Sequence, residues 1–183
     1  MLPSAGPSLR QICRVEIFAR SRHAGQFRKG DAQEPYIVHV EEVAELVTAW
    51  GGYESAIAAA WLHDTVEDCP PTSFAEIDQE FGSEVASIVR EMTDDKSLPK
   101  AERKKLQIVN AAKKSEAACL IKLADKSSNV AAIGTSPPAD WSAERKLEYV
   151  AWARTVVGPL PHKPDMAQKA FYNRCKATLG AIK

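Results

Sequence analysis

Residues 56–68 have the sequence AIAAAWLHDTVED, in which seven apolar residues are followed by four ionisable side chains. Because the run 56–62 is apolar on every side, it is typical of a helix buried in the core. The ionisable residues are His63, Asp64, Glu67 and Asp68. Burying them together would be costly, since isolated buried ions are strongly disfavoured. A divalent cation bound among them would resolve that conflict. The alternative is a helix that ends in a solvated acidic loop.

A second segment, residues 120–130, has the sequence LIKLADKSSNV. Helical geometry places its polar side chains on one face: Lys122, Asp125, Lys126 and Asn129. Apolar residues cover most of the remaining surface, so we expect a buried helix whose polar face lines an internal site. Asp125 would then be a ligand and Asn129 its hydrogen-bonding partner. The alternative is a solvated face with the two lysines outermost.

His39 stands at the head of a third helix, predicted near residues 40–50. A histidine in such a position is, taken alone, more often packed or exposed than a ligand. It gains significance only from the two segments above, which supply the other residues of a metal site.

The rest of the chain has the same helical character. No segment alternates apolar and polar residues in the manner of a strand, whereas Val85, Ile88, Val89 and Met92 recur at helical spacing. We expect an all-α fold: one compact helical bundle of about eight to ten helices, forming a single domain over residues 1–183. The predicted helices lie near residues 8–22, 40–50, 54–63, 74–80, 83–92, 100–113, 116–133, 141–157 and 164–181. Residues 28–37 are expected to form a loop.

Composition excludes several classes of partner. The chain has 183 residues with 24 Lys+Arg and 24 Asp+Glu, and this balance argues against a general nucleic-acid binder. The apolar run 56–62 is too short to span a bilayer, and the N-terminal sequence lacks the apolar region of a signal peptide. Four scattered cysteines without a CxxC motif are typical of reduced thiols. We therefore expect a cytoplasmic protein without a membrane partner. The last helix could pack on the body or form a dimer surface, so monomer and homodimer both stay open.

The ordered set of an isolated His, a His-Asp pair and a late Asp resembles the HD-domain phosphohydrolases. Further segments resemble the hydrolase domain of the RelA/SpoT family: QFRK (26–29), EPYIVH (34–39), LHDTVED (62–68), FG (81–82), MTDDK (92–96) and IKLADK (121–126). The segments LPKAERK (98–104), WSAER (141–145), EY (148–149) and WA (152–153) resemble its single-domain branch, the small alarmone hydrolases. The likeness extends from about residue 10 to residue 180.

This resemblance implies a fold, a cofactor and a reaction. It implies one Mn²⁺ ion per chain, bound by His39, His63, Asp64 and Asp125, with Glu67 and Asp68 as an acid/base pair. It implies a small nucleotide substrate, contacted by Arg28, Lys29, Lys96, Asn129, Arg145 and Tyr149. The implied reaction hydrolyses the 3′-diphosphate of guanosine tetra- or pentaphosphate, or of the adenosine counterparts, and releases pyrophosphate. The hydrolase fills the chain, so degradation without synthesis is expected.

Two other functions stay open: removal of one phosphate from NADPH or another nucleotide, and a catalytically silent nucleotide sensor. The intact ligand and acid/base set argues against the sensor. Some positions depart from the family pattern, with Val40 in place of a common Pro, and Ser127 and Ser128 in place of bulkier residues. Together with the loop at residues 30–33, they leave guanine or adenine preference open. Near the site, Lys100 and Arg103 are further candidates for phosphate contacts. For Lys104 a solvated helix face is favoured.

Overall fold

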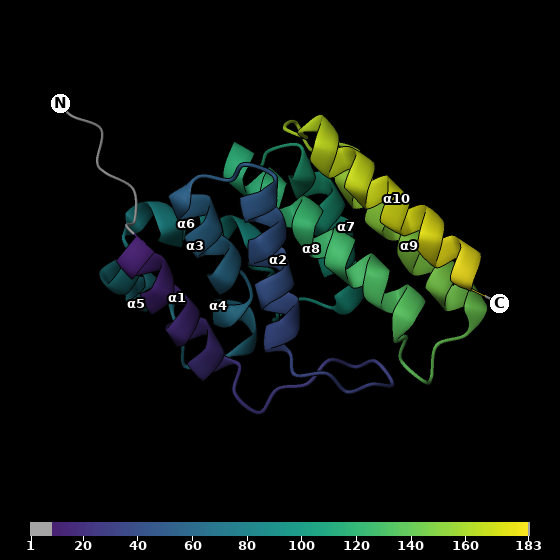
Figure 1. The fold of residues 1–183 in the computed structure, drawn as a ribbon, viewed down its shortest axis with the longest axis horizontal. Helices are drawn as coiled ribbons and strands as arrows, with labels where there is room; N and C mark the ends of the chain where they lie inside the picture. Colours follow the sequence, from purple (N-terminus) through teal and green to yellow (C-terminus); the bar gives the residue numbers. More distant parts are fainter. Residues whose placement is uncertain (1–8, 183) are drawn as a thin grey trace.

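The computed structural model describes residues 9–182, and this part of the chain folds into ten helices without a strand (Figure 1). The helices are α1 (Leu9–Arg22), α2 (Ile37–Ala49), α3 (Glu54–Leu62), α4 (Thr65–Asp68), α5 (Phe74–Phe81), α6 (Ser83–Met92), α7 (Lys100–Ala111), α8 (Glu116–Thr135), α9 (Ala143–Val157) and α10 (Asp165–Ala181). The all-α prediction is therefore confirmed. Residue 8, the predicted start of the first helix, lies outside the described residues. The same holds for residues 1–7, which are part of the N-terminal sequence that lacks the apolar region of a signal peptide.

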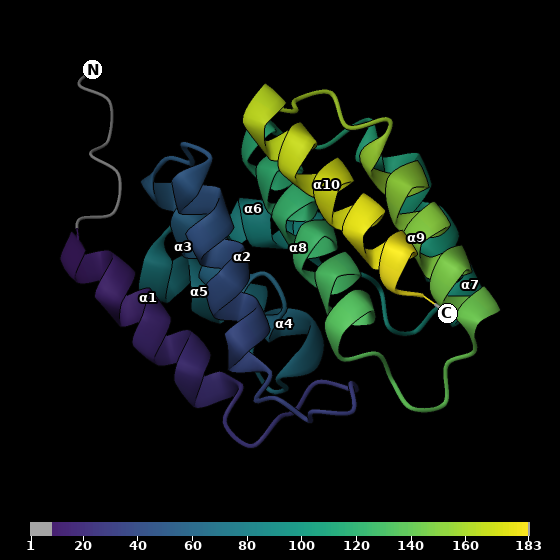
Figure 2. The same cartoon turned by 45° about the vertical axis from the view of Figure 1, so that its right-hand side comes forward.

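The two segments that dominated the sequence form the centre of the bundle. Helix α3 buries nearly all of its length, as its apolar sequence predicts. Helix α8 is also internal and lies between α2 on one side and α9 and α10 on the other (Figure 2). It buries even Lys122, Asp125 and Lys126, so the alternative of a solvated lysine face is excluded.

Serine side chains cap the N-termini of three helices. Ser73, Ser115 and Ser142 each accept a hydrogen bond from a backbone N–H in the first turn of α5, α8 and α9, respectively. Such caps satisfy donors that have no partner within the helix.

Two loops meet at one end of the bundle. The loop between α1 and α2 approaches the link between α8 and α9 so closely that a Cβ atom at Gly30 would lie 2.1 Å from the carbonyl oxygen of Ser136. The backbone N–H of Asp31 donates to the carbonyl of Pro137 at 3.2 Å, and that of Ala32 donates to Ser136 Oγ at 3.0 Å. Glycine at position 30 is therefore required for this contact.

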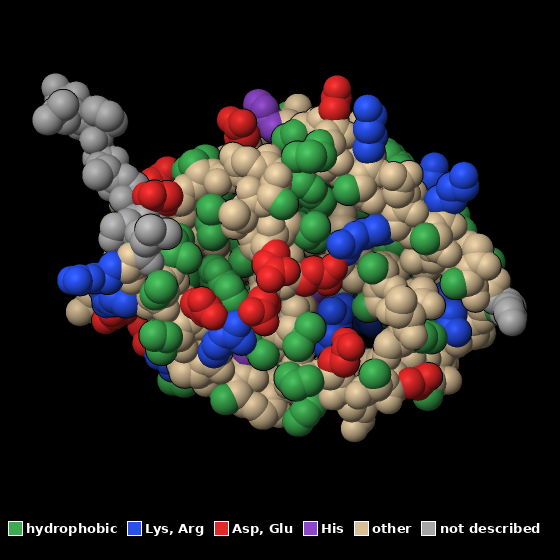
Figure 3. All heavy atoms as spheres, viewed as in Figure 1, with side chains coloured by type: hydrophobic (Ala, Val, Ile, Leu, Met, Phe, Trp, Pro, Cys, Tyr) green, Lys and Arg blue, Asp and Glu red, His purple; other side chains and the backbone are tan. Residues whose placement is uncertain are grey.

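The surface agrees with the balanced composition. On the face shown in Figure 3, Lys and Arg side chains are mixed with Asp and Glu, without a broad basic area. Within residues 9–182, no helix combines the length and apolar character needed to cross a membrane.

One connected apolar cluster includes side chains from α1 through to α10, and α10 packs along α8. The single-domain assignment and the oligomeric state stay predictions.

Candidate active site

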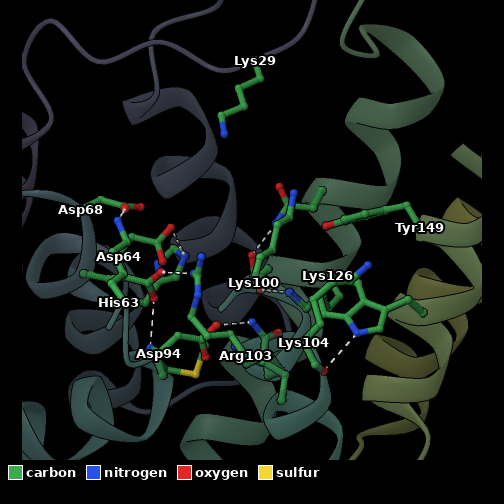
Figure 4. Close-up of a pocket in the computed structure, with 18 of the residues that line it drawn as sticks. Lys29, His63, Asp64, Asp68, Asp94, Lys100, Arg103, Lys104, Lys126 and Tyr149 are labelled. Carbon is green, nitrogen blue, oxygen red and sulfur yellow. Dashed lines mark hydrogen bonds and ion pairs between the residues drawn. The ribbon is translucent and has the colours of Figure 1, made fainter. Parts of the chain in front are cut away.

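A cavity of about 520 Å³ lies beside α8, and its wall draws on α4, α7 and α9 (Figure 4). Carboxylates gather at one end of it, around His63, Asp64 and Asp68, while Lys126 and Tyr149 lie toward the other end. Many of its lining side chains are cationic: Lys29, Lys96, Lys100, Arg103, Lys104, Lys122, Lys126 and Arg145. A chain with no net charge thus contains a locally basic cavity with an acidic end.

Two buried histidines meet at the acidic end. His39 comes from the first turn of α2 and His63 directly follows α3, and their ring centroids lie 5.4 Å apart. His63 Nδ1 lies 2.7 Å from the carbonyl of Ala60, which can only accept, so Nδ1 carries the proton. His39 Nδ1 lies 2.8 Å from Ser128 Oγ. Among the described residues, neither Nε2 atom has a hydrogen-bond partner. Buried polar atoms of this kind are rare unless a ligand satisfies them.

Two carboxylates approach the same Nε2 atoms. Asp125 Oδ1 lies 3.5 Å from His39 Nε2. Asp64 Oδ2 lies 3.2 Å from His63 Nε2 and 3.8 Å from His39 Nε2. His39, His63 and Asp125 each offer a ligand atom, and the three atoms lie within 4.8 Å of one another. A pair of imidazole nitrogens beside carboxylate oxygens is a donor set that suits a divalent transition-metal ion. The residues present therefore fit such an ion.

The pKa values of the two histidines and of Asp125 are shifted from their usual values. Burial lowers the pKa of His39 to about 4, and the neighbouring His63 contributes. Burial also disfavours the charge of His63, but Asp64 and Asp125 raise its pKa to about 9. Burial alone would raise the pKa of Asp125, yet Lys126 and Lys122 lower it to about 2. Near neutral pH, Asp125 is thus ionised and His39 is neutral, the forms in which both residues bind a metal.

Helix α8 supplies the partners of Asp125. Asn129 Nδ2 donates to Asp125 Oδ1 at 2.5 Å, and Lys126 Nζ lies 3.0 Å from Oδ2. Lys126 also lies over the ring of Trp152, 4.6 Å from its centroid. The expected hydrogen bond between Asn129 and Asp125 is present.

Glu67 and Asp68 line the cavity close to the histidines. Glu67 Oε2 accepts from the backbone N–H of Asp94 at 3.0 Å, and Oε1 lies 3.7 Å from Arg103. Burial raises the pKa of Glu67 above its usual value, and repulsion from neighbouring carboxylates adds to this effect. Asp68 is paired with Lys96. Both carboxylates are therefore held at the wall by cations from the segment 96–103.

The predicted nucleotide contacts divide into two groups. Five of them line the cavity: Lys29, Lys96, Asn129, Arg145 and Tyr149. Arg28 instead reaches α8, where its guanidinium donates to Asn129 Oδ1 at 3.3 Å and to Ser128 Oγ at 3.5 Å. Arg28 is therefore a neighbour of a cavity residue.

Lys104, for which a solvated helix face was favoured, is half-buried. Its ammonium group lines the cavity and lies 4.4 Å from the centroid of the Trp152 ring. Trp152 belongs to α9 and Lys104 to α7. This contact between two helices, which the sequence of α7 alone does not indicate, holds the Lys104 side chain at the cavity.

Sequence reasoning missed several residues of the site. Tyr36 donates from its hydroxyl to Asp64 Oδ2 at 2.5 Å, and Gln107 donates to Asp94 Oδ2 at 2.6 Å. Tyr36 lies one turn before His39, so the helical spacing could have indicated it. Gln107 carries no such signal, because its partner lies 13 residues away across a turn.

Comparison with known proteins agrees with this geometry. Residues 16–150 match the family described as HD domain. The chain is 46% identical to guanosine-3′,5′-bis(diphosphate) 3′-pyrophosphohydrolase MESH1 of Drosophila melanogaster over 145 residues, which are 78% of this chain and 80% of the relative. It is 42% identical to the Homo sapiens protein of the same name over 154 residues, 83% of this chain and 86% of the relative.

A solved structure of a metazoan orthologue of SpoT, which hydrolyses ppGpp and plays a role in starvation responses, superposes with a TM-score of 0.86. The two sequences are 38% identical, and the match covers 94% of this chain and 97% of the other. The likeness therefore extends over nearly the whole fold.

The donor set predicts that Asp125→Asn weakens divalent-metal binding, because it removes one of the ionised oxygens beside the two imidazoles. We expect a loss greater than the roughly 10–100-fold caused by changing a neighbour of a metal ligand. Calorimetric titration of metal-free protein with Mn²⁺ measures the affinity. Asp78→Asn, an exposed aspartate of α5, is the matched control. Equal affinities in the two variants would contradict a role for Asp125 as a ligand.

Proposed function

This chain belongs to the HD-domain family, and we propose that it is a metal-dependent hydrolase of the 3′-diphosphate of guanosine tetra- or pentaphosphate, or of the adenosine counterparts. The products would be pyrophosphate and GDP or GTP, or ADP and ATP. One observation carries the proposal: two buried imidazole nitrogens, without a hydrogen-bond partner among residues 9–182, lie beside ionised carboxylates at the acidic end of a cationic cavity. The activity in the names of the relatives supports the same reaction.

We propose that His39, His63, Asp64 and Asp125 bind one Mn²⁺ ion per chain. Tyr36 supports this assignment, because its hydroxyl orients the carboxylate of Asp64, and Asn129 orients that of Asp125 in the same way. Mixed imidazole and carboxylate donors are compatible with Mn²⁺. When bound, such an ion supplies Lewis-acid chemistry, polarising a phosphoryl oxygen and acidifying the attacking water.

In this proposal Glu67 and Asp68 transfer protons. The raised pKa of Glu67 suits a general base or acid, since catalytic pKa values near the working pH are the most effective. The backbone N–H of Asp94 and the guanidinium of Arg103 hold this carboxylate in place. Asp68 lies one residue further along the same short helix, where Lys96 restrains it.

The cations of the cavity would bind the phosphate groups of the nucleotide. Arginine gives bidentate, charge-assisted hydrogen bonds to phosphate, and Arg145 lies at the cavity with its guanidinium 4.7 Å from the Trp141 ring centroid. Tyr149 lies between the rings of Trp141 and Trp152, with centroid distances of 5.6 and 5.4 Å. Lys29, Lys96 and Asn129 complete the proposed contacts, and Arg28 acts by holding Asn129.

We propose that the chain works as one domain on a single small nucleotide, without a nucleic-acid partner. The continuous apolar cluster from α1 to α10 supports the single domain. Four free thiols support a reducing compartment such as the cytoplasm.

A substrate panel tests the reaction directly. Purified protein with Mn²⁺ is incubated with ppGpp, pppGpp, ppApp, pppApp and NADPH, and the released phosphates are identified. We expect pyrophosphate from at least one alarmone, because the cationic cavity can position a terminal diphosphate beside the acidic end, and slower release of orthophosphate from NADPH. Orthophosphate from NADPH alone would overturn the proposal in favour of a nucleotide phosphatase.

Replacing Glu67 by Gln should lower kcat by about 10²–10⁴, the usual contribution of a general acid or base, while the protein keeps its fold and its metal. Steady-state kinetics and metal titration of the same sample separate the two effects. Glu102→Gln, at an exposed position of α7, provides the control. A fully active Glu67→Gln enzyme would refute the assigned role.

Replacing Arg145 by Ala should raise KM about ten- to a hundredfold, because a charge-assisted hydrogen bond is worth about 1.5–3 kcal/mol. Arg154→Ala on the same helix is a suitable comparison, since Arg154 lies against Tyr172 and does not line the cavity. If both variants kept the wild-type KM, Arg145 would have no part in binding the nucleotide.

A further inference from the structure

A chain of hydrogen bonds leads from His39 to the C-terminal helix. His39 Nδ1 lies 2.8 Å from Ser128 Oγ, Ser128 Oγ donates to Glu42 Oε2 at 2.5 Å, and Arg174 Nη1 donates to Glu42 Oε1 at 2.5 Å. These residues belong to α2, α8 and α10, which lie next to one another in Figure 2. The chain of bonds thus crosses three helices and ends outside the cavity.

The order of donors along this chain is fixed by chemistry. A serine hydroxyl has one hydrogen, and an ionised carboxylate can only accept. Because Ser128 gives its hydrogen to Glu42, its oxygen must accept from His39. His39 therefore carries its proton on Nδ1, and the lone pair of Nε2 is directed at Asp125 and Asp64.

Glu42 is the residue that selects this arrangement. Without it, the hydroxyl of Ser128 could rotate and donate to His39 Nδ1, which would place the proton on Nε2. Burial would raise the pKa of Glu42, but the hydrogen bonds from Ser128 and Arg174 lower it below its usual value, so the carboxylate is ionised. Arg28, 3.5 Å from the same hydroxyl oxygen, offers a second donor to it.

We propose that Ser128, Glu42 and Arg174 form a positioning relay that holds His39 in its metal-binding tautomer, so that α10 contributes to metal affinity from outside the site. The inference rests on the proposed metal site. Partners that orient a ligating histidine are known to affect metal affinity about 10–100-fold. Here the orienting carboxylate acts through a hydroxyl and is itself held by an arginine on another helix.

The decisive variant is Glu42→Gln. Arg174 needs an acceptor, so the amide oxygen of the new side chain should face Arg174 and its NH₂ group should face Ser128. The hydroxyl then receives a hydrogen and can donate its own to His39 Nδ1. We expect Mn²⁺ affinity to fall about 10–100-fold in metal-free protein titrated by calorimetry. Nitrogen-15 NMR of the histidines should show the His39 proton moving from Nδ1 to Nε2.

Glu45→Gln, at an exposed position one turn away on α2, is the control and should match the wild type in both measurements. Circular dichroism checks that each variant is folded. If Glu42→Gln fails to fold, Ser128→Ala replaces it, with the same expected loss of affinity. A Glu42→Gln protein with wild-type affinity and an unchanged His39 tautomer would overturn the relay.

The NMR measurement also separates this inference from the proposed function. A wild-type protein that binds no divalent ion would refute the metal site by calorimetry alone. In that case a His39 tautomer that does not depend on Glu42 would refute the relay too, whereas a tautomer that changes would support the relay as a device for orienting His39.

Discussion

Buried charge in an apolar interior is the constraint on which the rest of this structure depends. Asp64 and Asp125 lie beside two imidazoles at the junction of α2, α3 and α8, where unbalanced ions would be strongly disfavoured. Each carboxylate therefore has its own partners: Tyr36 for Asp64, and Lys126 and Asn129 for Asp125. Tyr36 reaches Asp64 from the residue that precedes α2, whereas Lys126 and Asn129 reach Asp125 from within α8. The polar side chains at these places in the sequence therefore serve to balance the buried carboxylates.

The fold could be predicted in detail because its signals are local. The helix ranges predicted from helical spacing agree with the observed ones to within about three residues at each end. Only α4 lacked a predicted counterpart, since four residues are too few to show a period. The apolar sequence around residues 56–62 also indicated burial correctly, which located the pair His63-Asp64 at the end of an internal helix.

The site was less predictable, because its remaining features depend on contacts between helices. His39, His63 and Asp125 are brought together as the family resemblance implied, but nothing in the local sequence shows that Lys104 lies over Trp152 or that Arg28 turns toward α8. From the sequence, Ser128 is distinguished only by being smaller than the residue that the family commonly has at this position. Its bonds to His39 and Glu42 become visible only when α2 and α8 are packed together.

The close contact between Gly30 and Ser136 has a consequence for the thermodynamics of binding. Lys29 and Trp141, on the two segments that meet there, both border the cavity. Ordering a flexible segment costs about 1–2 kcal/mol per residue in backbone entropy, and a ligand that must order a loop loses that much of its affinity. Here the hydrogen bonds of Asp31 and Ala32 order the rim during folding. The rim is thus preorganised, and a ligand that binds in the cavity does not have to supply the entropy cost of ordering these two segments.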